Sequence, residues 1–297
     1  MQKLSIEVLE KMMGADLSKN EIDVLLYIAR YQDETGHIVG VHYKDVSEAV
    51  GISFQGYYDV LEALEQKEII MSSKKNYYDR DITILNNNFA GKENYGRGYV
   101  SLHCGMVRSE EWRKLKGGAK LLALHLMREW RIYKKHAKSE SYREGKDTLL
   151  NKYQKLMKRK KRTIRAYLGL LKPFLNLYLE DGKMYYITFR YAAENLPVNS
   201  ATENDEWRLH NLNISLRRNR IKEDTPEKIK DVINTLTQYH KEIKNGSVDL
   251  SQIIKKTIEI TNAERKNTAK WKRKLLPSFI HRLLRIELGL VPTMGEA

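Results

Sequence analysis

Apolar residues recur at helical spacing directly after a cap signal early in the chain. Ser18 precedes the pattern and Glu21 stands three residues later, an arrangement typical of a capping box at the start of a helix. The apolar residues that follow lie on one helical face. They are Ile22, Leu25, Leu26 and Ile28. The pattern therefore predicts a helix that begins after Ser18 and buries this face.

The next segments alternate short helices with extended pieces. After a turn and a short extended piece, residues 45–50 predict a short helix that Gly51 ends with a left-handed cap. Ser53 is expected to cap a second helix, which buries Tyr57, Val60, Leu61 and Leu64. Residues 68–85 predict a strand, a polar turn and another strand.

The same order of patterns recurs at residues 115–189. Residues 115–133 parallel the first helix, residues 148–175 parallel the following pair of helices, and residues 175–189 parallel the hairpin. Asp181 and Gly182 form a favoured pair for the tight turn of this hairpin. The longer stretch 134–147 replaces the short extended piece, and we expect it to be a flexible loop.

The stretch DVSEAVGISFQGYYDVLEALEQKEII, which begins at Asp45, resembles a winged helix-turn-helix domain, and residues 115–189 resemble a second copy. The expected fold class is mainly α with small β wings: two tandem winged-helix domains and a helical C-terminal domain. The expected boundaries are 1–90 and 99–192 for the winged helices and 205–297 for the helical domain, with linkers at 91–98 and 193–204. In the last domain, Thr225 is the expected cap of a helix whose first residue is Pro226.

Charge is distributed unevenly along the chain. The 53 Lys and Arg exceed the 38 Asp and Glu by 15. Residues 1–90 hold nine basic and fifteen acidic residues (−6), residues 91–190 hold twenty-five and nine (+16), and residues 191–297 hold nineteen and fourteen (+5). A basic excess of this size favours a polyanionic partner, most often nucleic acid. We expect that partner to bind mainly to the middle third.

Six of the eight residues from 158 to 165 are Lys or Arg. They fall at the start of the helix that enters the major groove of DNA in a helix-turn-helix. Arginine suits guanine O6 and N7, whereas Lys and Thr suit phosphates or bases. The alternative is a solvated basic face. The candidate DNA-binding residues here are Lys158, Arg159, Lys160, Lys161, Arg162, Thr163, Arg165 and Tyr167.

Other candidates are more scattered. Gln55 is suited to adenine, but Asp59, Glu62 and Glu65 line the same helix, so a protein-contact role for the acidic first domain stays open. The further candidates are Lys183 in the second wing, Ser53, Gln55 and Tyr57 in the first recognition helix, Lys74 and Lys75 in the first wing, and Lys272 and Arg273 in a second basic stretch.

Catalysis and metal binding have little support in the sequence. Cys104 is the only cysteine, which excludes an intrachain disulfide and fits a reducing cytoplasm. We expect Cys104, His37 and His125 to be structural. No stretch approaches the roughly 20 apolar residues of a membrane span. We therefore expect a cytoplasmic, nucleoid-associated protein that is not an enzyme and has no cofactor or metal.

These expectations define a bacterial protein that binds double-stranded DNA sequence-specifically as a homodimer. The single winged helices resemble MarR-like regulators, and two copies followed by a further domain resemble plasmid or phage replication initiators. A transcription regulator is slightly favoured. The first alternative is an initiator that binds origin repeats. The second is a DNA-bound adaptor that holds a protein partner through the acidic first domain.

Overall fold

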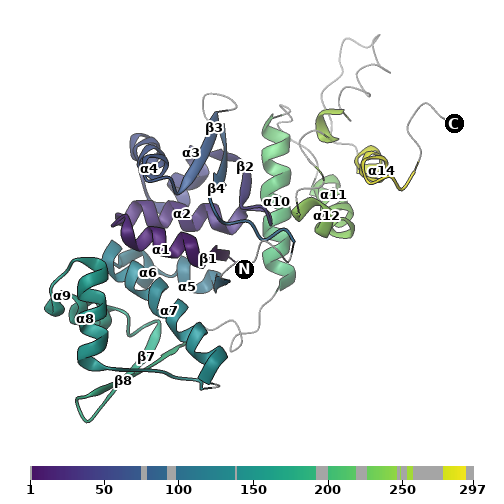
Figure 1. Ribbon diagram of the computed structural model, residues 1–297. Helices are drawn as coiled ribbons and strands as arrows, with labels where there is room; N and C mark the ends of the chain where they lie inside the picture. Colours follow the sequence, from purple (N-terminus) through teal and green to yellow (C-terminus); the bar gives the residue numbers. More distant parts are fainter. Residues whose placement is uncertain are drawn as a thin grey trace, which may run out of the picture. The chain divides into compact units, whose positions relative to one another are not determined.

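The computed structural model describes residues 2–74, 79–91, 98–137, 139–191, 200–218, 226–245, 248, 253–256 and 277–291. Within these ranges the protein is mostly helical with small antiparallel sheets (Figure 1), which confirms the expected mainly α class at this level. The chain forms two compact units. The first consists of Met1–Gln32 and Gly36–Val198, and the second of Asp33–Thr35 and Asn199–Ala297.

Residues 2–84, here called the first half, form the beginning of the first unit. The predicted capping box is confirmed, since Ser18 Oγ accepts from the Glu21 N–H at 3.3 Å and the Glu21 carboxylate accepts from the Ser18 N–H at 2.6 Å. Gly51 ends a helix in the left-handed conformation with φ 79°, as predicted. The elements are β1 (Gln2–Ser5), α1 (Ile6–Gly14), α2 (Lys19–Tyr31), β2 (His37–His42), α3 (Tyr43–Val50), α4 (Phe54–Gln66), β3 (Ile70–Lys74) and β4 (Asp79–Ile84).

Residues 99–189, here called the second half, repeat this order with different lengths. The order from α7 to β8 matches the order from α2 to β4, and the strand orders β2-β4-β3 and β6-β8-β7 correspond. The elements are β5 (Tyr99–Leu102), α5 (Cys104–Arg108), α6 (Glu110–Lys114), α7 (Gly117–Ala137), β6 (Tyr142–Gly145), α8 (Lys146–Met157), α9 (Lys161–Leu170), β7 (Leu175–Glu180) and β8 (Met184–Phe189).

The expectation of a flexible loop at 134–147 is wrong. Helix α7 continues to Ala137, and β6 pairs with β8 from Tyr142↔Ile187 to Gly145↔Met184. The indole N–H of Trp130 donates to the Glu140 carbonyl at 2.7 Å, and this bond connects α7 to the segment that precedes β6. In this four-residue strand only Tyr142 is fully buried, so its alternation is too short to be recognised from the sequence.

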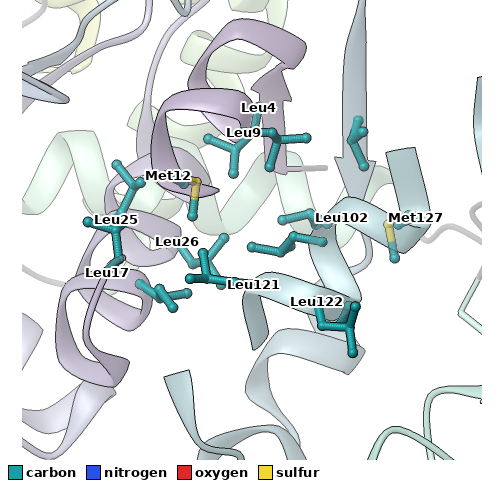
Figure 2. Close-up of a cluster of buried hydrophobic side chains, with 14 of the residues drawn as sticks. Leu4, Leu9, Met12, Leu17, Leu25, Leu26, Leu102, Leu121, Leu122 and Met127 are labelled. Atoms are coloured by element: carbon teal, nitrogen blue, oxygen red, sulfur yellow. The ribbon is translucent and has the colours of Figure 1, made fainter. Parts of the chain in front are cut away.

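The two halves share one hydrophobic core. Strand β1 pairs antiparallel with β5, and both α1 and α2 pack against α7. Figure 2 shows buried side chains from both halves meeting at this junction. Those labelled are Leu4, Leu9, Met12, Leu17, Leu25 and Leu26 from the first half, and Leu102, Leu121, Leu122 and Met127 from the second. Each half therefore leaves part of its apolar surface uncovered without the other.

A buried ion pair crosses the same junction. The Lys120 ammonium on α7 is fully buried and donates to both carboxylate oxygens of Asp23 on α2, at 2.5 and 2.7 Å. Burial lowers the pKa of Lys120, although Asp23 opposes this effect. Breaking a buried pair by removing one partner typically costs about 3–5 kcal/mol. The pair therefore helps to fix the position of α7 relative to α2.

The second unit is helical in its described ranges. Its helices are α10 (Ser200–Arg218), α11 (Pro226–Gln238), α12 (His240–Lys244) and α14 (Pro277–Glu287), and α11 packs against both α10 and α14. Pro226 is the first residue of α11, as predicted. Helix α10 begins inside the segment 193–204 that was expected to be a linker. The division of the chain at 91–98 and 193–204 stays a prediction.

The described ranges contain no helix that is both long and apolar enough to span a membrane. They also contain no group of three or more His, Cys, Asp or Glu placed to hold a metal ion. Cys104 forms no disulfide and is half-buried. His125 is buried, and its Nδ1 lies 3.0 Å from the Tyr153 hydroxyl. Burial lowers the pKa of His125 to about 4.

Candidate nucleic-acid interface

The basic residues from 158 to 165 lie in the turn between α8 and α9 and in the first turns of α9. Lys158 ends α8 in the left-handed conformation with φ 50°, and Lys160 is the N-cap of α9. We define the basic cluster as Lys158, Arg159, Lys160, Lys161, Arg162 and Arg165. Figure 1 shows α9 beside α8, and the two helices pack against each other.

The N-terminus of α9 has no side-chain cap. Lysine has no hydrogen-bond acceptor, and Lys160 forms no side-chain hydrogen bond to the helix, although its carbonyl accepts from the N–H groups of Thr163 and Ile164. A helix N-terminus carries a partial positive charge and binds anions. The basic cluster adds its own charge at this point, so the site is suited to phosphate.

The buried face of α9 fixes which side chains point outward. Ile164 and Leu168 are buried, and Leu171 and Leu175 continue this face beyond the helix. Arg162 and Arg165 are exposed. They are three residues apart, so they lie on one side of the helix. The packing therefore presents both guanidinium groups to solvent.

Most of the basic cluster has no acidic partner among the residues that the structure describes. Within the described ranges, no carboxylate oxygen lies within 4.0 Å of a side-chain nitrogen of Lys158, Lys160, Lys161, Arg162 or Arg165. Arg159 differs, because its guanidinium lies 2.9 Å from the carboxylate of Asp16, which follows α1. Both members of this pair are well exposed. The site thus keeps a concentrated positive charge that attracts a polyanion.

Thr163 and Tyr167 are less accessible than the arginines. Both are half-buried. The phenol ring of Tyr167 lies against Gly118 near the start of α7, and a Cβ atom added to Gly118 would be 2.7 Å from the Tyr167 hydroxyl oxygen. Tyr167 therefore contributes to the packing of α9 on α7.

The β7–β8 hairpin places Lys183 at its turn. Asp181 and Gly182 have φ values of 47° and 67°, as expected for the predicted tight turn, and Lys183 is exposed. The Lys183 carbonyl accepts from the N–H of Lys146, which connects the turn to the start of α8. Glu180 accepts a hydrogen bond from the Tyr186 hydroxyl at 2.6 Å and leaves an acidic group near the turn.

An aromatic row on the outer face of this hairpin was missed in the sequence. Tyr178 is 63% exposed, and its ring centroid lies 6.1 Å from that of Tyr186 on the paired strand. The Arg143 guanidinium on β6 lies 5.9 Å from the Tyr186 ring. The signal was the alternation in β7 and β8, in which Tyr178 and Tyr186 occupy the positions that face away from the core.

The corresponding helix of the first half is arranged differently. Ser53 caps α4, since its Oγ accepts from the Gly56 N–H at 3.1 Å. The Gln55 amide donates to the Asp59 carboxylate at 2.6 Å, one turn along the helix. Tyr57 is fully buried, and its hydroxyl donates to the Val41 carbonyl at 3.3 Å. Because it has no exposed surface, Tyr57 is a core residue and leaves the set of candidate DNA-binding residues.

The first hairpin carries few described cations. Lys74 ends β3, is exposed, and pairs in register with Arg80. The Arg80 guanidinium lies 5.5 Å from the Tyr58 ring and donates to Ser72 Oγ at 3.0 Å. Lys75, Lys272 and Arg273 lie outside the described residues. The described residues therefore bring the candidates together at α9 and leave the others dispersed.

No protein-family model matches the sequence, and no curated protein and no solved structure matches it.

Proposed function

We propose that the protein binds double-stranded DNA sequence-specifically through two tandem winged-helix domains, with α9 as the main recognition helix. The repeated order of helices and strands supports this proposal. So does the short turn from Lys158 to Lys160 between α8 and α9, which suits a helix-turn-helix. The single observation that carries the proposal is the basic cluster on an exposed, uncapped helix whose opposite face is buried.

Within this interface we assign different tasks to different cations. Arg165 contacts a base edge, because it is exposed and lies one turn into α9 on the same side as Arg162. Lys160 and Lys161 neutralise phosphates at the uncapped N-terminus. A cluster this dense cannot place every side chain on a base, so most of its members position the helix on the duplex.

A salt series on two duplexes tests this assignment. The binding site is first selected from random DNA, and then Arg165→Ala is titrated against the selected and a random duplex. Loss of a base contact should cost on the order of 1–3 kcal/mol on the selected site and much less on the random one. Lys160→Ala should instead weaken both complexes and lower the log–log salt slope by about one.

Equal losses on both duplexes for Arg165→Ala would rule out base contact by this residue. If neither substitution changed the affinity for any DNA, α9 would be excluded from the interface. The matched control is Lys172→Ala, since Lys172 is an exposed cation just beyond the C-terminal end of α9. It should leave specificity unchanged.

The first biological role that we propose is transcription regulation. In this role the protein is cytoplasmic and acts by binding DNA, not as an enzyme. Replication initiation at repeated origin sites is the second role, and it is favoured by the shared core, which fixes both halves in one unit. Genome-wide mapping of binding sites separates the two. A site in the chain's own promoter supports regulation, whereas an array of repeats at an origin supports initiation.

Two partners other than DNA belong to this proposal. A homodimer on DNA is expected because helix-turn-helix proteins commonly pair on two half-sites. Light scattering of the complex should give two chains per site, and one chain on a site without repeats would contradict the homodimer.

The exposed Asp59 and Glu62 on α4 favour a protein partner for the first half. Their replacement by Asn and Gln should then weaken that partner's binding and spare DNA binding.

A further inference from the structure

The outer face of the β6-β8-β7 sheet carries the aromatic row, which the contact proposed for α9 does not use. Arg143 on β6 pairs in register with Tyr186 on β8, and Tyr186 pairs with Tyr178 on β7. Residues directly opposite each other in antiparallel strands lie on the same face of a sheet. The aromatic row is therefore flanked by Arg143 on its own face, and Tyr178 lies on an edge strand.

Tyr178 is the most accessible residue of this face. Its exposed fraction of 63% is the largest among the large apolar and aromatic side chains that the structure describes. Its ring contacts the Tyr186 ring, with centroids 6.1 Å apart and ring planes at 49°. Because Tyr186 covers only part of the ring, Tyr178 presents a flat apolar surface to solvent. Another flat group can stack on such a surface.

Arg143 places a positive charge beside the two rings. Its guanidinium lies 5.9 Å from the Tyr186 ring, and hydrogen bonds to the hydroxyls of Tyr133 and Tyr186 raise the pKa of Arg143. Both hydroxyls are neutral, so Arg143 keeps its full charge. In the described part of the chain, no carboxylate oxygen lies within 4.0 Å of its side-chain nitrogens. Arg143 is exposed and is therefore accessible to a phosphate.

The charges of this face are distributed unevenly around Tyr178. The Arg190 Nε donates to the Asn176 carbonyl oxygen at 2.9 Å, so Arg190 lies beside the residue two positions before Tyr178 on β7. Glu180, two positions after Tyr178, ends the strand. Its carboxylate accepts the Tyr186 hydroxyl at 2.6 Å. A polyanion that contacts Tyr178 is therefore attracted by the side with the arginines and repelled by the side with Glu180.

The character of this face favours unpaired bases over a duplex or a protein. In a duplex, neighbouring bases about 3.4 Å apart cover each other's faces, whereas unpaired bases can stack on aromatic side chains. The outward neighbours Asn176, Glu180 and Thr188 are polar, and a stable protein interface needs an apolar centre. The net charge of +16 in residues 91–190 also favours a nucleic acid.

We propose that the aromatic row binds unpaired bases of single-stranded DNA, as a second nucleic-acid surface separate from α9. A base stacks on the exposed ring of Tyr178, Tyr186 supports that ring, and Arg143 binds a phosphate of the same strand. This surface has little sequence preference, because every base has a π face. It retains a strand that has already separated from its complement. This function adds to the duplex binding proposed above and does not depend on it.

Anisotropy titrations of the full chain with three labelled DNAs of equal length test the proposal. The first is oligothymidine, the second is a strand with an abasic sugar at every position, and the third is a duplex. Stacking on Tyr178 should make oligothymidine bind about tenfold more tightly than the abasic strand at the same salt concentration. The two strands carry the same phosphates, so charge does not contribute to this difference.

Two substitutions at Tyr178 test whether its ring is the stacking group. Tyr178→Ala should reduce the preference for oligothymidine to less than about twofold, with unchanged affinity for the abasic strand and the duplex. Tyr178→Phe keeps the ring and should keep the preference. The matched control is Met71→Ala, because Met71 is 60% exposed on β3, the corresponding strand of the first half, and has no aromatic ring. It should behave as the wild type, and circular dichroism checks the fold of each variant.

Arg143→Gln separates the contribution of charge from that of the ring. It should weaken the binding of both single strands and lower the log–log salt slope by about 0.7 for each, as expected for one phosphate contact on a single strand. The preference for oligothymidine should stay at about tenfold, because Tyr178 is unchanged. An unchanged salt slope would contradict the phosphate contact.

Four further outcomes would overturn the proposal. Equal affinity of the wild type for oligothymidine and the abasic strand would exclude stacking, and loss of the preference in Tyr178→Phe would assign it to the hydroxyl group. An equal loss on the duplex in Tyr178→Ala would make the hairpin a duplex contact. An unchanged preference in that variant would leave the row to a protein partner. The comparison of the two single strands contains no duplex, so it stays decisive if duplex binding by α9 is not found.

Discussion

The two halves of the first unit have the same order of elements from α2 to β4 and from α7 to β8, yet opposite charge on the matching helices. Helix α4 exposes Asp59 and Glu62, and its Gln55 amide is occupied by Asp59. Helix α9 exposes Arg162 and Arg165 with no carboxylate nearby in the described ranges. The comparison shows that the same order of elements can present helices of opposite charge to solvent.

The N-termini of α4 and α9 also differ. The Ser53 side chain accepts a hydrogen bond from a backbone N–H of α4, whereas the Lys160 side chain forms no such bond with α9. A capping side chain stabilises a helix by about 1 kcal/mol, and a cation at the N-terminus opposes the helix dipole. The first half thus stabilises its own helix. The second half has no side-chain acceptor at the corresponding position of α9.

The largest effect should come from removing the charge of α9. The variant Lys160→Ala/Lys161→Ala/Arg162→Ala/Arg165→Ala should lose about 10³-fold in affinity for the selected duplex, with a salt slope lower by about 2.7 from the three cations other than Arg165. Anisotropy titrations across salt concentrations measure both. The full chain is required, since the halves share one core. The matched variant Gln55→Ala/Asp59→Ala on α4 should change affinity by less than about threefold, and an equal loss there would contradict the comparison.

Acid should reveal a difference between the contributions of α2 and α7 to the shared core. The buried face of α2 contains no histidine, whereas α7 buries His125, whose pKa burial lowers to about 4. The unfolded chain binds this proton near pH 6.5 and the folded chain does not, so stability falls as pH decreases below 6.5. The loss from this group between pH 7 and pH 5 should be about 2 kcal/mol.

Urea unfolding of the wild type and His125→Gln at the two pH values measures this loss. The glutamine can still bond to the Tyr153 hydroxyl, so the variant should fold and show a smaller pH dependence. His240 in the second unit also has its pKa lowered to about 4 by burial. It is present in both proteins and cancels in the difference. The same pH dependence in both would assign the acid sensitivity to other groups.

Exchanging the helix caps should produce opposite changes in stability. Ser53→Ala should lower the free energy of unfolding by about 1 kcal/mol, because α4 loses its cap. Lys160→Ser should raise it by up to about 1 kcal/mol, because α9 gains one, and should lower the salt slope of DNA binding by about 0.9. Denaturant titrations and binding assays on both variants provide the values. A loss of stability in Lys160→Ser would show that the lysine stabilises α9 by another route.

The smallest effect concerns Asp16, the acidic residue that pairs with Arg159 of the basic cluster. Asp16→Asn should free Arg159 and raise DNA affinity about two- to threefold, with stability changed by less than about 1 kcal/mol since the pair is exposed. Asn accepts the left-handed backbone of Asp16, which has φ 46°. Anisotropy at low and high salt measures the change. The gain should vanish at high salt, and a gain that persists would exclude an electrostatic cause.

Local features of the fold could be predicted from the sequence. The Ser18 capping box, the Gly51 helix end, the apolar face of α9 and the Asp181–Gly182 turn all depend on residues that are near neighbours in the chain. The pairing of β1 with β5 was not predicted, because it joins strands of four residues that lie far apart in the sequence. The hydrophobic periodicity of a strand does not identify the strand with which it pairs.

Only part of the candidate site could be predicted from the sequence. The outward direction of Arg162 and Arg165 follows from the spacing of Ile164 and Leu168. The ion pair between Arg159 and Asp16 could not be foreseen, since it depends on how the halves pack. Tyr57 was counted both as a core residue and as a DNA contact, and burial decides for the core.

The pairing of β1 with β5 has a consequence during protein synthesis. Gln2 and its partner Leu102 are 100 positions apart in the sequence. At about 5–20 residues per second, the ribosome needs about 5–20 s to make this stretch. Throughout that time β1 has an unpaired edge, and the apolar surface of α1 and α2 that α7 covers is open to other chains and to chaperones. The first half therefore completes its fold only when the nascent chain has delivered α7, well after its own last strand has left the ribosome.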